Sequence, residues 1–169
     1  SNPLIPPKSD GQIVVSSVNI EENGQRQPVN YVLPPGISRM FDSSQPQLLQ
    51  QNEQALSMKI TDLSPADARA VYKSTAYDLR RYKRLQMFAH AEAPIDESKT
   101  LSNGDFSVFI RLGSDYKNNY YEYEVPLDLT PHSTILYNTN NSADQEKVWP
   151  LNNTLNFKLE TLTDLKLER

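Results

Sequence analysis

The side chains that could perform acid–base or nucleophilic catalysis in this chain are few. The 169 residues contain no cysteine and only two histidines, His90 and His132, so a nucleophile would be a hydroxyl or a carboxylate with an imidazole beside it. His90 lies in a predicted strand, where a packed histidine is more common than a catalytic base. His132 follows Pro131 in a predicted loop without an acidic neighbour placed for a triad. The sequence therefore predicts that the protein is not an enzyme and carries no cofactor.

Acidic side chains offer two further kinds of site. Glu122 and Glu124 share one face of a predicted strand, a spacing compatible with the paired carboxylates of a glycosidase. A charged face in contact with solvent is the more common role for such a pair. Residues 115–119 supply oxygen ligands but lack the alternating acids and the glycine of a calcium loop. We predict no metal site.

Aromatic side chains are better candidates for a binding surface. Tyr116, Tyr120, Tyr121 and Tyr123 crowd around one predicted hairpin, and Trp149 is the single tryptophan. Tyrosines on both faces of a strand leave some rings pointing outward, where a flat amphipathic ring suits sugar stacking or a protein interface. Cross-strand aromatic pairing is the structural alternative, and the sequence favours neither.

A basic cluster precedes one of the predicted strands. It comprises Arg80, Arg81, Lys83 and Arg84. The cluster could face a ligand, but a solvated strand face that pairs with Glu122 and Glu124 is the preferred interpretation. We expect no nucleic-acid partner, because the formal net charge is −4 and nucleic-acid binding needs a clustered basic surface.

The element that would carry most of these side chains is a hairpin at residues 104–127. Alternate residues are apolar on either side of a polar break at 113–119, and side chains of a strand point to opposite faces with period two. The apolar positions are Phe106, Val108, Ile110, Leu112, Tyr121, Tyr123 and Val125. The break is rich in turn-forming residues, so we predict two antiparallel strands.

The N-terminal part predicts a second hairpin and a stiff arm. Residues 13–20 alternate as a strand, Asn23-Gly24 is a strong hairpin signal, and residues 27–33 would form the returning strand, restricted to a sheet edge by Pro28. The prolines at 34 and 35 hold the following backbone extended. We expect residues 30–39 to act as a docking arm that lies against another surface of the intact protein.

The remaining pattern predicts more strands than helices. Residues 55–63, 85–91 and 154–162 alternate as strands. Ser64-Pro65 and Asp67 are typical of a helix start, which predicts a short helix through residue 72. Residues 130–147 are a polar connection with a short strand at 135–137. No apolar run is long enough for a membrane-spanning helix.

Together these elements predict a mostly β protein. The fold class that fits is an antiparallel β-sandwich, jelly-roll-like, with one short helix and Pro-rich extended arms. We divide the chain into a disordered leader (1–12), an N-terminal hairpin with the Pro-rich arm (13–54) and a β-sandwich domain (55–169). An apolar content of 37% and a mean hydropathy of −0.63 place part of the chain in polar loops and tails.

Five segments between residues 26 and 169 resemble one protein family. They are RQPVNYVLPPGISR, SQPQLLQQNEQALSMKITDL, DARAVYKSTAYDLRRYKRLQMFAHAEA, GDFSVFIRLGSDYKNNYYEYEVPL and LTDLKLER. The chain resembles the SprA/Sov family over residues 18–169. These are very large gliding-motility proteins of the Bacteroidetes outer membrane, which form the translocon of the type IX secretion system.

The resemblance implies a soluble, non-catalytic piece of a much larger outer-membrane protein, located in the cell envelope. The implied partners are the remainder of that protein, other secretion-system components or secreted substrates. The resemblance assigns no catalytic or transport residue. Two alternatives remain from the residues themselves: a carbohydrate-binding β-sandwich module of a cell-surface protein, and a purely structural spacer.

Overall fold

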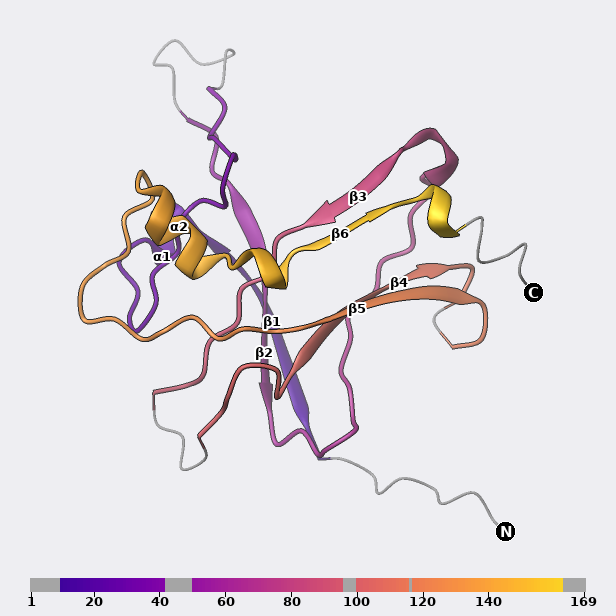
Figure 1. Ribbon diagram of the computed structural model, residues 1–169, viewed down its shortest axis with the longest axis horizontal. Coiled ribbons are helices and arrows are strands. Elements are labelled where there is room, and N and C mark those ends of the chain that lie inside the picture. The colour runs from indigo at the N-terminus through magenta and orange to yellow at the C-terminus, as the bar shows by residue number, and fades with distance from the viewer. Residues whose placement is uncertain (1–9, 42–49, 96–99, 116, 163–169) are drawn as a thin grey trace.

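The computed structural model describes residues 10–41, 50–95, 100–115 and 117–162. The strands are β1 (Gln12–Asn19), β2 (Gln54–Thr61), β3 (Arg84–Met87), β4 (Ser107–Gly113), β5 (Tyr120–Pro126) and β6 (Leu155–Lys158). They form three separate antiparallel pairs, β1–β2, β3–β6 and β4–β5 (Figure 1). The helices are α1 (Ile20–Asn23) and α2 (Ser142–Val148), with 3₁₀ turns at Leu79–Arg81 and Leu151–Asn153.

The predicted hairpin at residues 104–127 is confirmed as β4–β5. Its register places Ile110 opposite Tyr123 and Leu112 opposite Tyr121, so the apolar side chains share one face as predicted. At the turn, the Asp115 carboxylate accepts hydrogen bonds from the backbone N–H groups of Lys117 (2.8 Å) and Asn118 (2.6 Å). Gly113 is required there, because a Cβ would lie 2.1 Å from the Asn119 carbonyl oxygen.

The partner of β1 differs from the prediction. Instead of pairing with residues 27–33, β1 pairs along its whole length with β2, from Gln12 opposite Thr61 to Asn19 opposite Gln54. The Asn19 side chain accepts a hydrogen bond from the Glu22 N–H (2.9 Å) and so starts α1 immediately after the strand. The Asn-Gly signal is therefore used to end a helical turn, with Gly24 at φ −65°, and the chain does not double back along β1.

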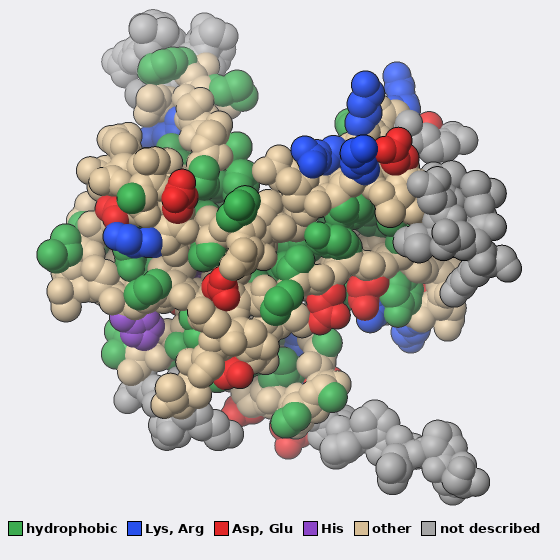
Figure 2. Space-filling view, in the orientation of Figure 1, with side chains coloured by type: hydrophobic (Ala, Val, Ile, Leu, Met, Phe, Trp, Pro, Cys, Tyr) green, Lys and Arg blue, Asp and Glu red, His purple; other side chains and the backbone are tan. Residues whose placement is uncertain are grey.

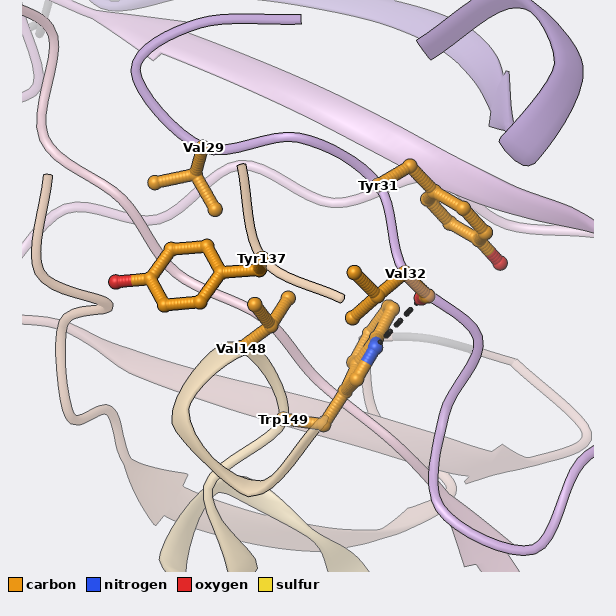
Figure 3. Close-up of a cluster of buried hydrophobic side chains, with 6 residues drawn as sticks. All are labelled: Val29, Tyr31, Val32, Tyr137, Val148 and Trp149. Carbon is orange, nitrogen blue, oxygen red and sulfur yellow. Dashed lines mark hydrogen bonds between the residues drawn. The ribbon is translucent and has the colours of Figure 1, made fainter. Parts of the chain in front are cut away.

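The segment expected to return as a strand instead forms the centre of the core. Val29, Tyr31 and Val32 are buried without being part of a sheet, and they pack against the end of α2 and its approach. Figure 3 shows this cluster, which comprises Val29, Tyr31, Val32, Tyr137, Val148 and Trp149. The indole Nε1–H donates to the Val32 carbonyl oxygen (2.9 Å), so this irregular backbone is hydrogen-bonded by a side chain.

The side chain of Asn30 likewise hydrogen-bonds irregular backbone, at Tyr137 on the other side of the cluster. The Asn30 carboxamide accepts from the Tyr137 N–H (2.8 Å) and donates to the Tyr137 carbonyl oxygen (2.9 Å). One amide thereby replaces the pair of backbone hydrogen bonds that a neighbouring strand would provide. Residues 135–137 consequently lie beside residue 30 without forming the short strand that the sequence predicts.

The positions of the helices differ from the prediction. At residues 64–67 the chain makes a turn closed by the Asp67 N–H and the Ser64 carbonyl (3.1 Å), with Ala66 at φ 63°, so the predicted helix at 64–72 is wrong. Helix α2 lies in the segment expected to be an irregular connection. Asn141 caps it by accepting from the N–H groups of Ala143 (2.9 Å) and Asp144 (3.3 Å).

The two short strands on the C-terminal side form a third pair. The predicted strands at 85–91 and 154–162 are present but shorter than expected: β3 ends at Met87 and β6 ends at Lys158. Leu85 lies opposite Phe157. The Phe157 ring stacks on Tyr123 of β5, with the two centroids 4.7 Å apart, which joins the β3–β6 pair to the β4–β5 pair.

The expected fold class is confirmed at the level of mostly strands with few helices. The described residues form three small sheets and an irregular core outside them, and they do not confirm a closed sandwich or a jelly roll. No helix within these residues has the length and apolar character needed to cross a membrane.

Candidate interaction surface

Three of the tyrosines predicted to form a binding surface, Tyr120, Tyr121 and Tyr123, lie half-buried on β5. Tyr123 is covered by Phe157 as described, and the Arg111 guanidinium lies over the Tyr120 ring, 4.2 Å from its centroid. Tyr121 extends the apolar face opposite Leu112. Tyr116 lies outside the described residues. The structure therefore brings three of the four tyrosines into cross-strand and inter-sheet contacts.

Trp149, the other predicted ligand-facing aromatic residue, is in the core. Its side chain is 7% exposed, its N–H is bonded to Val32, and the rings of Tyr31 and His90 meet it edge-on at centroid distances of 6.0 and 5.9 Å. The hypothesis of an outward-facing tryptophan was wrong because the sequence did not reveal the partners that enclose the ring.

The described side chains of the basic cluster, Arg81, Lys83 and Arg84, lie on the surface as expected, but none of these three pairs with Glu122 or Glu124. All three are exposed, and Figure 2 shows Lys and Arg side chains over the end of the β3–β6 pair. Glu122 is paired with Arg111, its register partner, at 2.5 Å. Glu124 accepts a hydrogen bond from Ser107. The side chain of Arg80 lies outside the described part of the chain.

The first residues of the Pro-rich arm at residues 30–39 pack within the described chain, and the expectation that the arm lies against another surface of the intact protein stays a prediction. These first residues are in the core, and the Leu33 N–H donates to the Thr139 hydroxyl (2.9 Å). At the end of the arm Arg39 pairs with Glu21 of α1. Ile37 and Met40 remain exposed.

His90 is part of a partly buried polar network. One ring nitrogen, Nδ1, lies 2.8 Å from the Val148 carbonyl oxygen and 3.0 Å from the Thr130 hydroxyl, and Nε2 lies 3.4 Å from a Glu92 oxygen. Arg26 binds the same carboxylate through two hydrogen bonds of 2.5 and 2.8 Å. Burial alone would raise the pKa of Glu92, but hydrogen bonds from His90 and Arg26 and their charges lower it to about 2. The network ties the chain before β4 to the end of α2.

The apolar surface that sequence analysis missed lies on the β1–β2 pair. The register puts five apolar side chains on one face: Ile13, Val15, Leu56, Met58 and Ile60. We call this the ribbon face. Leu56 is 59% exposed and Val15 44% exposed, so the described residues leave this face uncovered. The sequence signal was the alternation itself, but alternation reports an apolar face without saying whether its cover belongs to the same chain.

A second exposed apolar stretch connects β2 to β3. Residues 71–82 have almost no regular structure, and their large apolar side chains point to solvent. These are Val71, Tyr72, Tyr77, Leu79 and Tyr82. Tyr77 is 72% exposed. Apolar side chains also reach the surface over the face of the molecule shown in Figure 2.

Among the described residues, no three His, Asp or Glu side chains are grouped closely enough to bind an ion. What the surface offers chemically is exposed apolar area on an extended backbone, which is suited to contact with other polypeptide.

Comparison with known proteins identifies the family. A family of motility-related and secretion proteins, SprA_N, matches residues 4–169.

The chain belongs to the SprA_N family.

This confirms the resemblance seen in the sequence segments. A search of curated proteins found no match. As a member of the SprA_N family, the chain is related to motility and secretion, and the exposed apolar faces are to be interpreted in that setting.

Proposed function

We propose that this SprA_N chain is a non-catalytic domain of an outer-membrane secretion and gliding-motility translocon, where it binds other parts of the assembly in the cell envelope. The family relationship supports the secretion role. The observation that carries the binding role is the distribution of apolar side chains. Among the described residues, 19 large apolar side chains are exposed and eight are buried.

The arrangement of the exposed side chains supports an interface more than their number does. Single apolar side chains are normal on protein surfaces, whereas contiguous apolar patches mark sites of interaction. Five of the exposed or half-buried residues form the ribbon face, and five more lie in the 71–82 connection. A two-stranded sheet is also marginally stable by itself, so a partner that covers β1–β2 would stabilise it.

The polar groups support a structural role over catalysis. His90 bonds to the main-chain carbonyl at the end of α2 and faces a carboxylate that Arg26 holds, so the imidazole serves to fix segments together. The carbohydrate-binding alternative has no comparable support. The faces of Tyr120 and Tyr123 are covered by Arg111 and Phe157, and Trp149 is enclosed in the core.

The proposal is tested in cells whose secretion depends on the parent protein. We expect Tyr77→Ser combined with Tyr82→Ser to reduce secretion and gliding, because both rings are exposed and their loss removes apolar contact area from a partner without disturbing the core. The matched control, Tyr77→Phe with Tyr82→Phe, keeps the area and should retain function. Normal secretion in the serine variant would contradict the proposed role of this surface.

A further inference from the structure

Strand β1 differs from the other described strands in having no protected edge. Its sequence, QIVVSSVN, contains no charged residue and no proline. Each of the other five strands carries at least one charge: Lys59 in β2, Arg84 in β3, Arg111 in β4, Glu122 and Glu124 in β5, and Lys158 in β6. Charged side chains and prolines on edge strands normally prevent pairing with another chain.

The free edge of β1 is also chemically open. Within the described residues β1 has β2 as its sole sheet neighbour, so the outward N–H and C=O groups on one side of the strand face away from any ladder. Asn19 at the end of the strand is the exception, because its N–H donates to the Asn23 side chain (3.0 Å). Val14, Val15 and Val18 are β-branched and favour extended backbone. A row of open backbone groups is complementary to one kind of ligand, another extended polypeptide segment.

The ribbon face indicates the side-chain chemistry of that segment. A strand added beside β1 would place alternate side chains next to Ile13 and Val15 and extend the apolar face of β1–β2. On the opposite face it would meet Val14 and Ser16, which are uncharged. An uncharged edge beside an apolar face offers nothing to pair with a charged strand, so it selects an uncharged one rich in apolar residues.

We infer that β1 is a receptor for strand addition: an extended, uncharged segment of another part of the translocon pairs backbone to backbone with residues 12–17, the part of β1 that lies outside the core. This inference rests on the proposed function and specifies the chemistry of the partner. The added strand lies about 4.8 Å from β1 and about twice that distance from β2. Proximity to β1 therefore distinguishes strand pairing from contact with the ribbon face alone.

The test uses the intact parent protein carrying a short diazirine photo-crosslinking residue at Ser16, with Ser57 as the matched control. Ser16 and Ser57 are register partners on the same face, one on each strand. We expect crosslinking from position 16 to one uncharged segment, several-fold above that from position 57. A third position, Tyr77, reports the proposed interaction independently of β1.

Four outcomes overturn the inference. They are equal crosslinking from positions 16 and 57, crosslinking to a helical segment, crosslinking to β1 of a second copy, and no crosslinking from position 16. If Tyr77 still crosslinks in any of these cases, the proposed function stands without strand addition. If neither position 16 nor Tyr77 crosslinks, both proposals fail.

A substitution provides a second measurement. Ser16→Lys adds to β1 the charge that the other strands carry, and Ser57→Lys adds the same charge on the same face of β2. In the intact protein we expect Ser16→Lys to accelerate hydrogen exchange of the β1 amides several-fold, with little change for Ser57→Lys. Equal acceleration in both variants would point to loss of the β1–β2 pair and would overturn strand addition at β1.

Discussion

Individual side chains hold together a core that has little regular backbone. Asn30, Trp149 and Asn153 each direct polar atoms at main-chain groups that no strand or helix satisfies. Asn153 is fully buried, accepts from the Asp128 N–H (2.7 Å) and donates to the Asp128 carbonyl oxygen (2.8 Å). Buried main-chain groups without partners are costly, so these side chains make the irregular segments stable enough to be buried.

Trp149→Phe tests the importance of one such bond. The substitution leaves the buried Val32 carbonyl without its donor and removes part of the ring from the core. We expect the free energy of unfolding to fall by about 1–3 kcal/mol, measured from urea titration by circular dichroism. Leu151→Ala, at a side chain that is 83% exposed two residues away, serves as the control and should change stability by less than about 0.5 kcal/mol. Equal effects of the two substitutions would contradict the assigned role of the indole.

Glu92 gives the stability of the protein a definite dependence on pH. Its folded-state pKa of about 2 is below the ordinary value of 4.5, so its contribution is fully present above about pH 5 and is lost as the pH falls toward 2. The contribution is on the order of 3 kcal/mol before solvent around the partly exposed Arg26 screens it. We expect Glu92→Gln to destabilise the protein near pH 6 and to converge with the wild type near pH 2.

The measurement for Glu92 is urea unfolding at a series of pH values. Glu146→Gln changes an exposed carboxylate of α2 in the same way and should leave the pH profile unaltered. A difference between wild type and Glu92→Gln that stayed constant down to pH 2 would show that the carboxylate charge is not the cause.

At the scale of elements, local capping decides where helices form. Helix α2 contains Ser142, Ala143 and Asp144 after Asn141, and Lys147 near its end, so its termini complement the helix dipole. Residues 64–72 also begin with residues typical of a helix start, but the backbone turns at Ala66, whose φ of 63° lies in the left-handed region. Tertiary packing explains why only one of the two segments is helical. Helix α2 buries Val148 against the core, whereas residues 64–72 are mostly exposed.

Asn141→Ala tests the cap. Losing the side-chain acceptor for the Ala143 and Asp144 N–H groups should lower stability by about 1 kcal/mol, measured as a shift of the thermal unfolding midpoint. Asn140→Ala changes an exposed neighbour that lies before the cap and should have a smaller effect. A shift for Asn140→Ala as large as that for Asn141→Ala would rule out the capping explanation.

At the scale of the whole molecule, the buried core lies to one side of the three strand pairs. Val29, Val32 and Trp149 are enclosed near α1 and α2, whereas the β1–β2 pair extends away from them (Figure 1). Val18 and Ala55 lie on the opposite face of the β1–β2 pair and pack against the core at one end of the two strands, and the described residues leave the ribbon face uncovered. This arrangement suits a domain that is completed by its surroundings.

A designed disulfide tests the long-range pairing of β1 with β2. Ser16 and Ser57 are opposite each other, and Cα atoms of facing residues lie about 4.5–5.5 Å apart, within the range that a disulfide spans. Because the chain lacks cysteine, oxidation of the Ser16→Cys, Ser57→Cys variant should give one intramolecular bond and raise the urea midpoint. The Ser16→Cys single variant, which cannot close the loop, is the control. Failure to form the bond under oxidising conditions would refute the register.

The sequence predicted those features that depend on neighbouring residues. Hairpin β4–β5, with its Tyr-rich strand and turn at Asp115, follows from period-two alternation and local turn chemistry. The same reasoning found β1 and β2 as strands, but it paired β1 with residues 27–33 because Asn23-Gly24 is a hairpin signal, whereas β1 pairs with β2.

Alternation and turn residues by themselves determined that this SprA_N chain is built mostly of strands, because side-chain direction along a strand is a local property. Only the tertiary structure decided that Trp149 and residues 29–32 form the core and that the described part of the chain leaves the ribbon face uncovered. Burial depends on which distant segments meet, through contacts such as Trp149 with Val32 and Asn30 with Tyr137. Those contacts join residues more than a hundred positions apart, and no local pattern encodes them.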